Sequence, residues 1–216
     1  MARRQNGFTL IEIAIVLVII GLLLGGVLKG QELINQAKIK KVTNDFESMA
    51  AMVYAYQDRY KKLPGDDNQA VSRWGAATTK DGDGNSNLNK GTTVMDFDSV
   101  TTDDEPRLFW QHMRLAGFIA GDTTKQDQGT NAVGGILGVQ TDAGATGKLL
   151  PGLVFCSSKL TGKFAVAVDA QFDDGKPDTG SVRGFTDAAT GSARAAPATA
   201  YTDDNVALYT VCRSLN

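Results

Sequence analysis

The sequence contains few of the residues and motifs that carry catalytic chemistry. Its 216 residues include one histidine, His112, and two cysteines. A zinc site of the HExxH type needs two histidines, so this class is excluded. The sequence also has no nucleophile-elbow motif for a serine hydrolase, and no GxxxxGK[ST] or GxGxxG pattern for phosphate binding. We therefore expect a protein that is not an enzyme and that requires no cofactor.

The chain also lacks a surplus of either charge, since its formal net charge is −2. A large nucleic-acid-binding surface needs a clear excess of basic residues. The composition therefore gives no strong nucleic-acid signal, although it does not exclude a local basic patch.

What the chain does have is a long apolar run, Phe8–Leu28, in which Thr9 and Glu12 are the polar members. A helix rises about 1.5 Å per residue, so a run of this length crosses the ~30 Å hydrocarbon core of a membrane. A carboxylate near the start of such a span is costly in lipid. Glu12 is therefore expected to have a partner.

A short basic leader precedes this run, which opens with the segment Gly7-Phe8-Thr9-Leu10-Ile11-Glu12. The segment resembles the class III signal of type IV prepilins and of type II secretion pseudopilins. The resemblance implies that residues 1–7 are a leader, which a prepilin peptidase cuts after Gly7 before methylating the amine of Phe8. It also implies that residues 8–28 stay on the mature protein, unlike the apolar part of an ordinary signal peptide.

In such a protein Glu12 is the fifth mature residue, and we expect it to serve assembly. Its carboxylate would pair with the Phe8 amine of a neighbouring subunit in the growing filament. Low dielectric strengthens that attraction and makes either charge costly when it is alone. An interfacial glutamate without a partner is the alternative.

The resemblance further implies where the protein acts and what it meets. The anchored subunit would lie in the bacterial inner membrane with its head in the periplasm, and the assembled filament in the periplasm or at the cell surface. The implied partners are copies of the chain or related pilins, the prepilin peptidase and methylase, and an assembly platform.

Three functions remain open at this point. The first is a pilin or minor pilin of a surface filament, for adhesion, motility or DNA uptake. The second is a pseudopilin of a type II secretion system. The third, from a different class, is a membrane-anchored binding protein or enzyme whose leader resembles prepilins by chance.

The helix is expected to continue beyond the membrane, over residues 29–62, as an amphipathic segment. Apolar residues recur at spacings of three and four, which places them on one helix face. They are Ile39, Val42, Phe46, Met49, Val53, Tyr56 and Tyr60. Pro64-Gly65 ends the pattern, because proline lacks the donor N–H and restricts the residue before it.

Residues 63–216 are expected to form an α+β head, an antiparallel sheet packed on the long helix. A helix is predicted over 106–116, where His112 falls on the apolar face and is expected to be packed and hydrogen-bonded. Strands are predicted at 153–156, 163–168 and 206–212, and loops at 129–147 and 187–200.

The two cysteines, Cys156 and Cys212, lie late in the chain. A head outside the cytoplasm can oxidise such a pair, so a disulfide is expected. Two unpaired buried thiols are the alternative. A stapled C-terminal region is common in surface pilins, so the pair favours the first of the three functions.

The first oxygen-rich segment begins at residue 81. Its candidate ligands alternate along the chain: Asp81, Asp83, Asn85 and Asn87. Alternate oxygens suit a loop that wraps a hard cation, so the segment can hold a structural Ca²⁺. The EF-hand pattern is incomplete, because Gly84 comes one place early and Thr92 replaces the final acid. A solvated turn is the alternative, whereas a DxDG phosphatase would need an apolar strand before the motif.

The second acidic segment covers residues 169–180. It resembles a phrase in the C-terminal sheet of some pilin-like proteins, several of which hold calcium in C-terminal loops. The resemblance makes four residues candidate ligands: Asp169, Asp173, Asp174 and Asp178. A hairpin turn is the alternative, because Asp-Gly and Pro-Asp are favourable turn sequences. Such a calcium cluster favours the pseudopilin interpretation.

Overall fold

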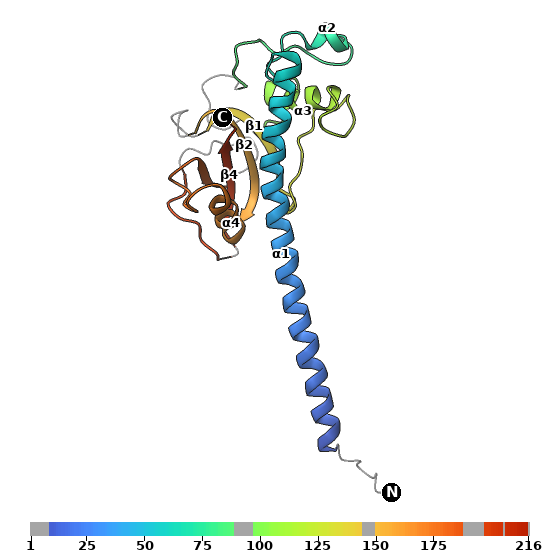
Figure 1. Cartoon of the computed structure of the whole chain (residues 1–216), viewed down its shortest axis with the longest axis vertical. Coiled ribbons are helices and arrows are strands. Elements are labelled where there is room, and N and C mark those ends of the chain that lie inside the picture. Colours follow the sequence, from blue (N-terminus) through green and yellow to red (C-terminus); the bar gives the residue numbers. More distant parts are fainter. Residues whose placement is uncertain (1–8, 89–96, 144–149, 188–196, 205, 216) are drawn as a thin grey trace. The chain divides into compact units, whose positions relative to one another are not determined.

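The computed structural model describes residues 9–88, 97–143, 150–187, 197–204 and 206–215. Its elements in chain order are α1 Leu10–Tyr60, α2 Ala70–Trp74, α3 Glu105–Leu115, β1 Leu137–Ala143, β2 Leu150–Thr161, α4 Gly162–Phe172, β3 Val182–Thr186 and β4 Leu208–Ser214 (Figure 1). A long apolar N-terminal helix and a four-stranded antiparallel sheet form an α+β fold, as the sequence predicts. The chain divides into two compact units, one ending at Lys38 and one beginning at Ile39, which we call the N-terminal and C-terminal units.

α1 is one unbroken helix of 51 residues. In the C-terminal unit, the central part of its predicted apolar face is buried, with side chains at most 4% exposed: Val42, Phe46, Met49, Val53 and Tyr56. Ile39 and Tyr60, at the two ends of that face, are partly buried against the same core. The helix ends just before Lys61, whose φ of 56° is left-handed and which lies three residues ahead of Pro64.

The sheet has the strand order β1-β2-β4-β3, and every neighbouring pair is antiparallel. Its central strands β2 and β4 lie beside the C-terminal half of α1 (Figure 1). The contact is made by Phe46 of α1, whose ring packs edge-on against Phe155 of β2 with the ring centroids 5.0 Å apart. The buried stripe of α1 and one face of the sheet therefore share one hydrophobic core.

The strand predicted at 163–168 is wrong, because these residues lie in helix α4, Gly162–Phe172. Short apolar runs are ambiguous between strand and helix by periodicity alone. The buried residues of α4 are Gly162, Phe164, Ala165, Val168 and Asp169, a helical spacing rather than an alternating one. Packing of this face on the sheet decides the conformation.

The loop predicted at 129–147 is also wrong in part, because it contains strand β1. Glycine and polar residues weaken the strand signal of β1 in the sequence. In the structure, the buried side-chain amide of Gln140 has hydrogen-bond partners for both its oxygen and its nitrogen. Gln140 accepts the Phe97 N–H at 3.1 Å and donates to the Asp142 carbonyl at 2.6 Å. Strand β3, Val182–Thr186, was not predicted at all, and most of the loop predicted at 187–200 lies outside the described residues.

The other predicted elements of the C-terminal unit are confirmed. α3 covers the helix predicted at 106–116 within one residue at each end, and Gly117 after it has a φ of +79°. The predicted strands at 153–156 and 206–212 correspond to β2 and β4, the latter beginning at Leu208.

Cys156 and Cys212 form a disulfide with each other, so neither is a free thiol. They are directly opposite each other on β2 and β4, with their Cα atoms 4.1 Å apart. Both are fully buried in a second hydrophobic cluster on the sheet, together with Phe97 and Phe185. The bond therefore joins the two central strands of the sheet.

Irregular segments contact both outer strands of the sheet. On the β1 side, the Leu88 N–H donates to Thr141 Oγ1 at 2.8 Å. On the β3 side, Gly184 donates its N–H to the Pro177 carbonyl and accepts the Ala198 N–H with its own carbonyl. Contacts at the edges of a sheet help to protect it from unintended strand pairing.

Candidate functional site

The described part of the N-terminal unit is an apolar helix whose large side chains are exposed. Sixteen large apolar side chains between Leu10 and Ile34 are each at least 47% exposed. Within the described residues, α1 is the one helix whose length and composition would let it cross a membrane. Four glycines lie in this part of α1, and a Cβ built on any of them would meet no atom within 4 Å: Gly21, Gly25, Gly26 and Gly30. Their small size has no packing role within a single chain.

Glu12 and Thr9 form a capping box at the start of α1. The Thr9 N–H donates to Glu12 Oε2 at 2.8 Å, and the Thr9 hydroxyl donates to the same oxygen at 2.6 Å. In return, the Glu12 N–H donates to Thr9 Oγ1 at 3.3 Å. Two helix-terminal N–H groups are thereby satisfied, which stabilises the first turn.

This role of Glu12 was missed in the sequence, although Thr-x-x-Glu before an apolar run is its signature. The box does not depend on the leader, because it uses only groups of residues 9–12. The predicted cleavage residues Gly7 and Phe8 lie outside the described residues. The predicted pairing of Glu12 with a neighbouring amine remains a prediction.

The first carboxylate cluster consists of Asp66, Asp83 and Glu105, which each offer an oxygen within 4.8 Å of the others. Asp66 follows α1, Asp83 lies on the loop after α2, and Glu105 opens α3. Backbone groups hold them in place, because Glu105 accepts the Asp83 N–H at 2.9 Å and Asp66 accepts the N–H groups of Asn85 and Ser86. Of the ligands predicted in this segment, Asp83 alone belongs to the cluster.

The other predicted ligands of this segment make local hydrogen bonds. Asp81 accepts the Val71 N–H at 2.7 Å and so holds the first turn of α2. The Asn85 side chain donates to Asp83 Oδ2 at 2.7 Å, and its carbonyl oxygen accepts the Asn87 N–H at 2.7 Å. These are side-chain turns of the kind that Asn and Asp favour. Asp66 and Glu105 lie too far along the sequence to be found from this pattern.

Burial raises the pKa of two of these carboxylates, and their neighbours add to the effect on Glu105. Burial raises the pKa of Glu105 to about 7, and the nearby charges of Asp83 and Asp66 act in the same direction. Burial also raises the pKa of Asp66, against the opposing effect of the Ser86 N–H. The cluster thus favours either bound protons or a cation.

The second carboxylate cluster brings together three of the four residues predicted there, Asp169, Asp173 and Asp174. Asp169 is fully buried on α4 and accepts hydrogen bonds from the Tyr201 hydroxyl at 2.7 Å and the Gly175 N–H at 3.1 Å. Asp178 is exposed and is not in the cluster. The segment connects α4 to β3, so it is not a hairpin turn.

Carboxylate–backbone contacts shape the second cluster. Asp173 accepts the N–H groups of Ser181 and Val182 at the start of β3. A Cβ on Gly180, whose φ is +70°, would lie 1.6 Å from Asp173 Oδ2, so this turn requires glycine. Burial raises the pKa of Asp169, whereas the Thr179 hydroxyl lowers the pKa of Asp174. Charged oxygen ligands in a tight loop are the donor set that Ca²⁺ uses.

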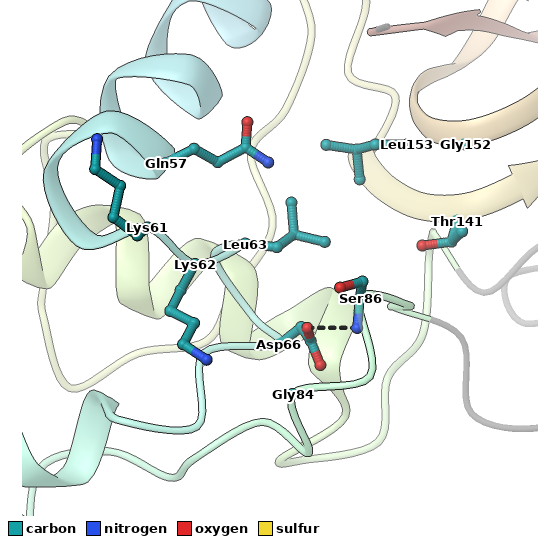
Figure 2. Close-up of a pocket in the computed structure, with 10 residues that line it drawn as sticks. All are labelled: Gln57, Lys61, Lys62, Leu63, Asp66, Gly84, Ser86, Thr141, Gly152 and Leu153. Atoms are coloured by element: carbon teal, nitrogen blue, oxygen red, sulfur yellow. Dashed lines mark hydrogen bonds between the residues drawn. The ribbon is translucent and has the colours of Figure 1, made fainter.

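A cavity of about 590 Å³ lies next to the first cluster, between the end of α1 and the β1–β2 end of the sheet (Figure 2). Lys61 and Lys62 line one wall, Leu153 the opposite wall, and Asp66 the floor. The figure shows Asp66 hydrogen-bonded to the Ser86 amide, a 2.8 Å contact, so this carboxylate holds the loop that forms the floor (Figure 2). The cavity carries both charges and small apolar surfaces.

Residues 2–28 match the family model of the prokaryotic N-terminal methylation motif. The match covers the basic leader, the predicted cut site and the apolar run with Glu12. This motif is the leader of type IV prepilins and pseudopilins, so the resemblance found in the sequence is confirmed for this part of the chain. No curated protein and no solved structure is significantly similar to the chain.

Proposed function

We propose that this chain, which carries a prepilin-type leader, is a structural pilin or minor pilin of a type IV pilus-like filament. It would serve adhesion, motility or DNA uptake through assembly, without enzymatic chemistry. The observation that carries the proposal is the coincidence of the methylation motif at residues 2–28 with an uncovered apolar helix.

The exposed helix needs another apolar environment. Fully burying one Val, Leu or Ile side chain is worth about 2 kcal/mol, and sixteen such side chains are exposed from Leu10 to Ile34. A bilayer supplies this environment before assembly, and the same helix of neighbouring subunits supplies it in a filament. The glycines that have no packing role within one chain would then allow neighbouring helices to approach closely.

Glu12 sets the register of assembly in this proposal. Its capping box with Thr9 holds the carboxylate at the start of the helix. In an apolar filament core, a lone carboxylate or amine is costly, so only registers that pair them are stable.

The pre-assembly location would be the inner membrane, with the C-terminal unit in the periplasm.

The test is Glu12→Ala in a host that has the matching prepilin peptidase and assembly platform. We expect normal removal of residues 1–7 by mass spectrometry and loss of the chain from sheared filaments. Glu32→Ala is the matched control, because Glu32 is an exposed acid on the same helix that pairs with Lys29. Normal filament incorporation of Glu12→Ala would contradict the pairing role.

The second candidate is a pseudopilin of a type II secretion system. The cluster of Asp169, Asp173 and Asp174 supports it, because three of the four candidate calcium ligands of that segment lie together. Deleting the gene distinguishes the two. Loss of surface filaments supports the pilin, whereas retention of a secreted hydrolase in the periplasm supports the pseudopilin.

A further inference from the structure

His112 is the one histidine of the chain, and both of its ring nitrogens are used. The side chain is fully buried on α3. Nδ1 accepts the Gly65 N–H at 3.0 Å, so it carries no proton. Nε2 lies 3.0 Å from the Lys80 carbonyl and must therefore donate to it. These contacts require the neutral imidazole with its proton on Nε2, and they confirm the packed, hydrogen-bonded histidine that the sequence predicts.

The two backbone groups belong to one segment, residues 61–88, which we call the α2 arm. Its two halves are bonded together, because the Gly82 N–H donates to the Asp67 carbonyl at 3.1 Å. α3 holds the arm with hydrogen bonds from three side chains, of Glu105, Gln111 and His112. Of these three side chains, His112 is the one whose hydrogen bonds reach both halves of the arm, at Gly65 before α2 and at Lys80 after it.

The contact at Gly65 is tight. Its φ is +89°, and a Cβ built there would lie 2.5 Å from the Glu105 carbonyl oxygen. A side chain at residue 65 would therefore clash with α3, so the arm approaches α3 closely at this point. Protonation of Nδ1 would place its N–H against the Gly65 N–H in a dry site, leaving two donors without an acceptor.

We propose that His112 is a pH-sensitive clasp: its neutral ring ties the α2 arm to α3, and its protonation releases the arm. The charged groups that face the ring come from the arm itself, Arg73 on α2 and Asp81 after it. Burial lowers the pKa of His112 to about 4, and Arg73 acts in the same direction. The Lys80 carbonyl and Asp81 act in the opposite direction but do not outweigh burial.

The size of the effect follows from proton linkage. With a pKa of about 4 when the arm is closed and 6.5 when it is open, acidification from pH 7.5 to 5.0 should raise arm opening roughly 30-fold. Glu105 titrates in an overlapping range with the opposite sign, because its pKa is raised to about 7. A Glu105→Gln background therefore isolates the effect of His112.

The first experiment is an NMR titration of the untagged full chain in detergent micelles, where one histidine gives one set of imidazole signals. We expect the Nε2–H tautomer at pH 7.5 and an imidazole pKa near 4. An imidazole pKa of 6 or above, or the Nδ1–H tautomer, would overturn the proposal. This measurement needs no substitution, so it stands even if a His112 variant does not fold.

The second experiment measures hydrogen exchange at the Gly65 amide in Glu105→Gln, relative to amides of β2. We expect its protection factor to fall roughly 30-fold between pH 7.5 and 5.0. In the double variant Glu105→Gln/His112→Gln, residue 112 cannot titrate. The protection factor of the Gly65 amide relative to the β2 amides should then stay constant over the same pH range. An equal fall in both variants would show that another group controls the arm and would refute the clasp.

Discussion

Removing the Cys156–Cys212 bond should destabilise the C-terminal unit strongly while leaving its fold intact. The bond joins directly opposed residues of β2 and β4, which are 56 positions apart in sequence. The enclosed chain includes α4 and β3, so reduction frees these elements in the unfolded state. The folded sheet does not need the covalent link, because backbone pairing on both sides of β4 remains.

The magnitude follows from the length of that loop. In the chain-entropy model, closing a loop of this length is worth roughly 4 kcal/mol at 25 °C. For a domain of this size, each kcal/mol corresponds to about 2–4 °C in Tm, so reduction should lower Tm by roughly 12 °C. Replacing both cysteines with alanine should cost more, because it also removes two sulfur atoms from the buried cluster beside Phe97 and Phe185.

The assay is thermal unfolding of the full chain in detergent, followed by tryptophan fluorescence. Trp74 and Trp110 both lie in the C-terminal unit, whereas far-UV dichroism would be dominated by the 51 residues of α1. The oxidised chain, the chain in a phosphine reductant and Cys156→Ala/Cys212→Ala form the comparison. A fall in Tm of less than about 3 °C on reduction would refute the loop-entropy reasoning.

Three further predictions concern the core and the carboxylates. Phe46→Ala should lower the free energy of unfolding by about 4 kcal/mol in chemical denaturation, because the ring is fully buried against Phe155 and Phe172. Between about pH 4.5 and 7, Glu105 should be protonated in the folded chain but ionised in the unfolded chain. Its contribution to the free energy of unfolding should therefore be lost as the pH rises through this range. Glu105→Gln should remove that part of the pH slope of Tm, and an unchanged slope would contradict the raised pKa. If the sequence-predicted site binds calcium, millimolar Ca²⁺ should raise the Tm of the chain by mass action. Asp174→Asn should remove this rise. No rise in the unaltered chain would contradict the calcium hypothesis.

The parts of the fold that follow from local sequence were predicted. The apolar run is a signal of length and composition and the stripe from Ile39 to Tyr60 one of helical period, and α1 contains the stripe and the run from Leu10 onward. Helix α3 has the same kind of signal, with Pro106 in its first turn and Gly117 beyond its end. The T-x-x-E capping box is an equally local signal, although it was not among the predictions.

The parts that depend on distant partners were not predicted. β1 has glycine, glutamine and aspartate in seven residues, and it is a strand because β2 pairs with it. β3 is defined by pairing with β4, which lies more than twenty residues later. The apolar run at 163–168 indicates a strand by local sequence, and its helical conformation in α4 is evident only from the face that it buries. Tertiary packing overrides local propensity in each case.

The carboxylate clusters show the same limit at the level of the site. Alternation from Asp81 to Asn87 describes a turn in which neighbours bond to each other, so most of these side chains are used locally. The first cluster instead joins Asp83 to Asp66 and Glu105, 17 and 22 positions away, and the packing of the α2 arm on α3 brings them within 4.8 Å. The second cluster was expected from the resemblance of residues 169–180 to a phrase of pilin-like proteins, and three of its four candidate residues lie together in α4 and just beyond its end. A cluster carried by one short segment can therefore be anticipated from local sequence, whereas a cluster shared by three elements requires the fold.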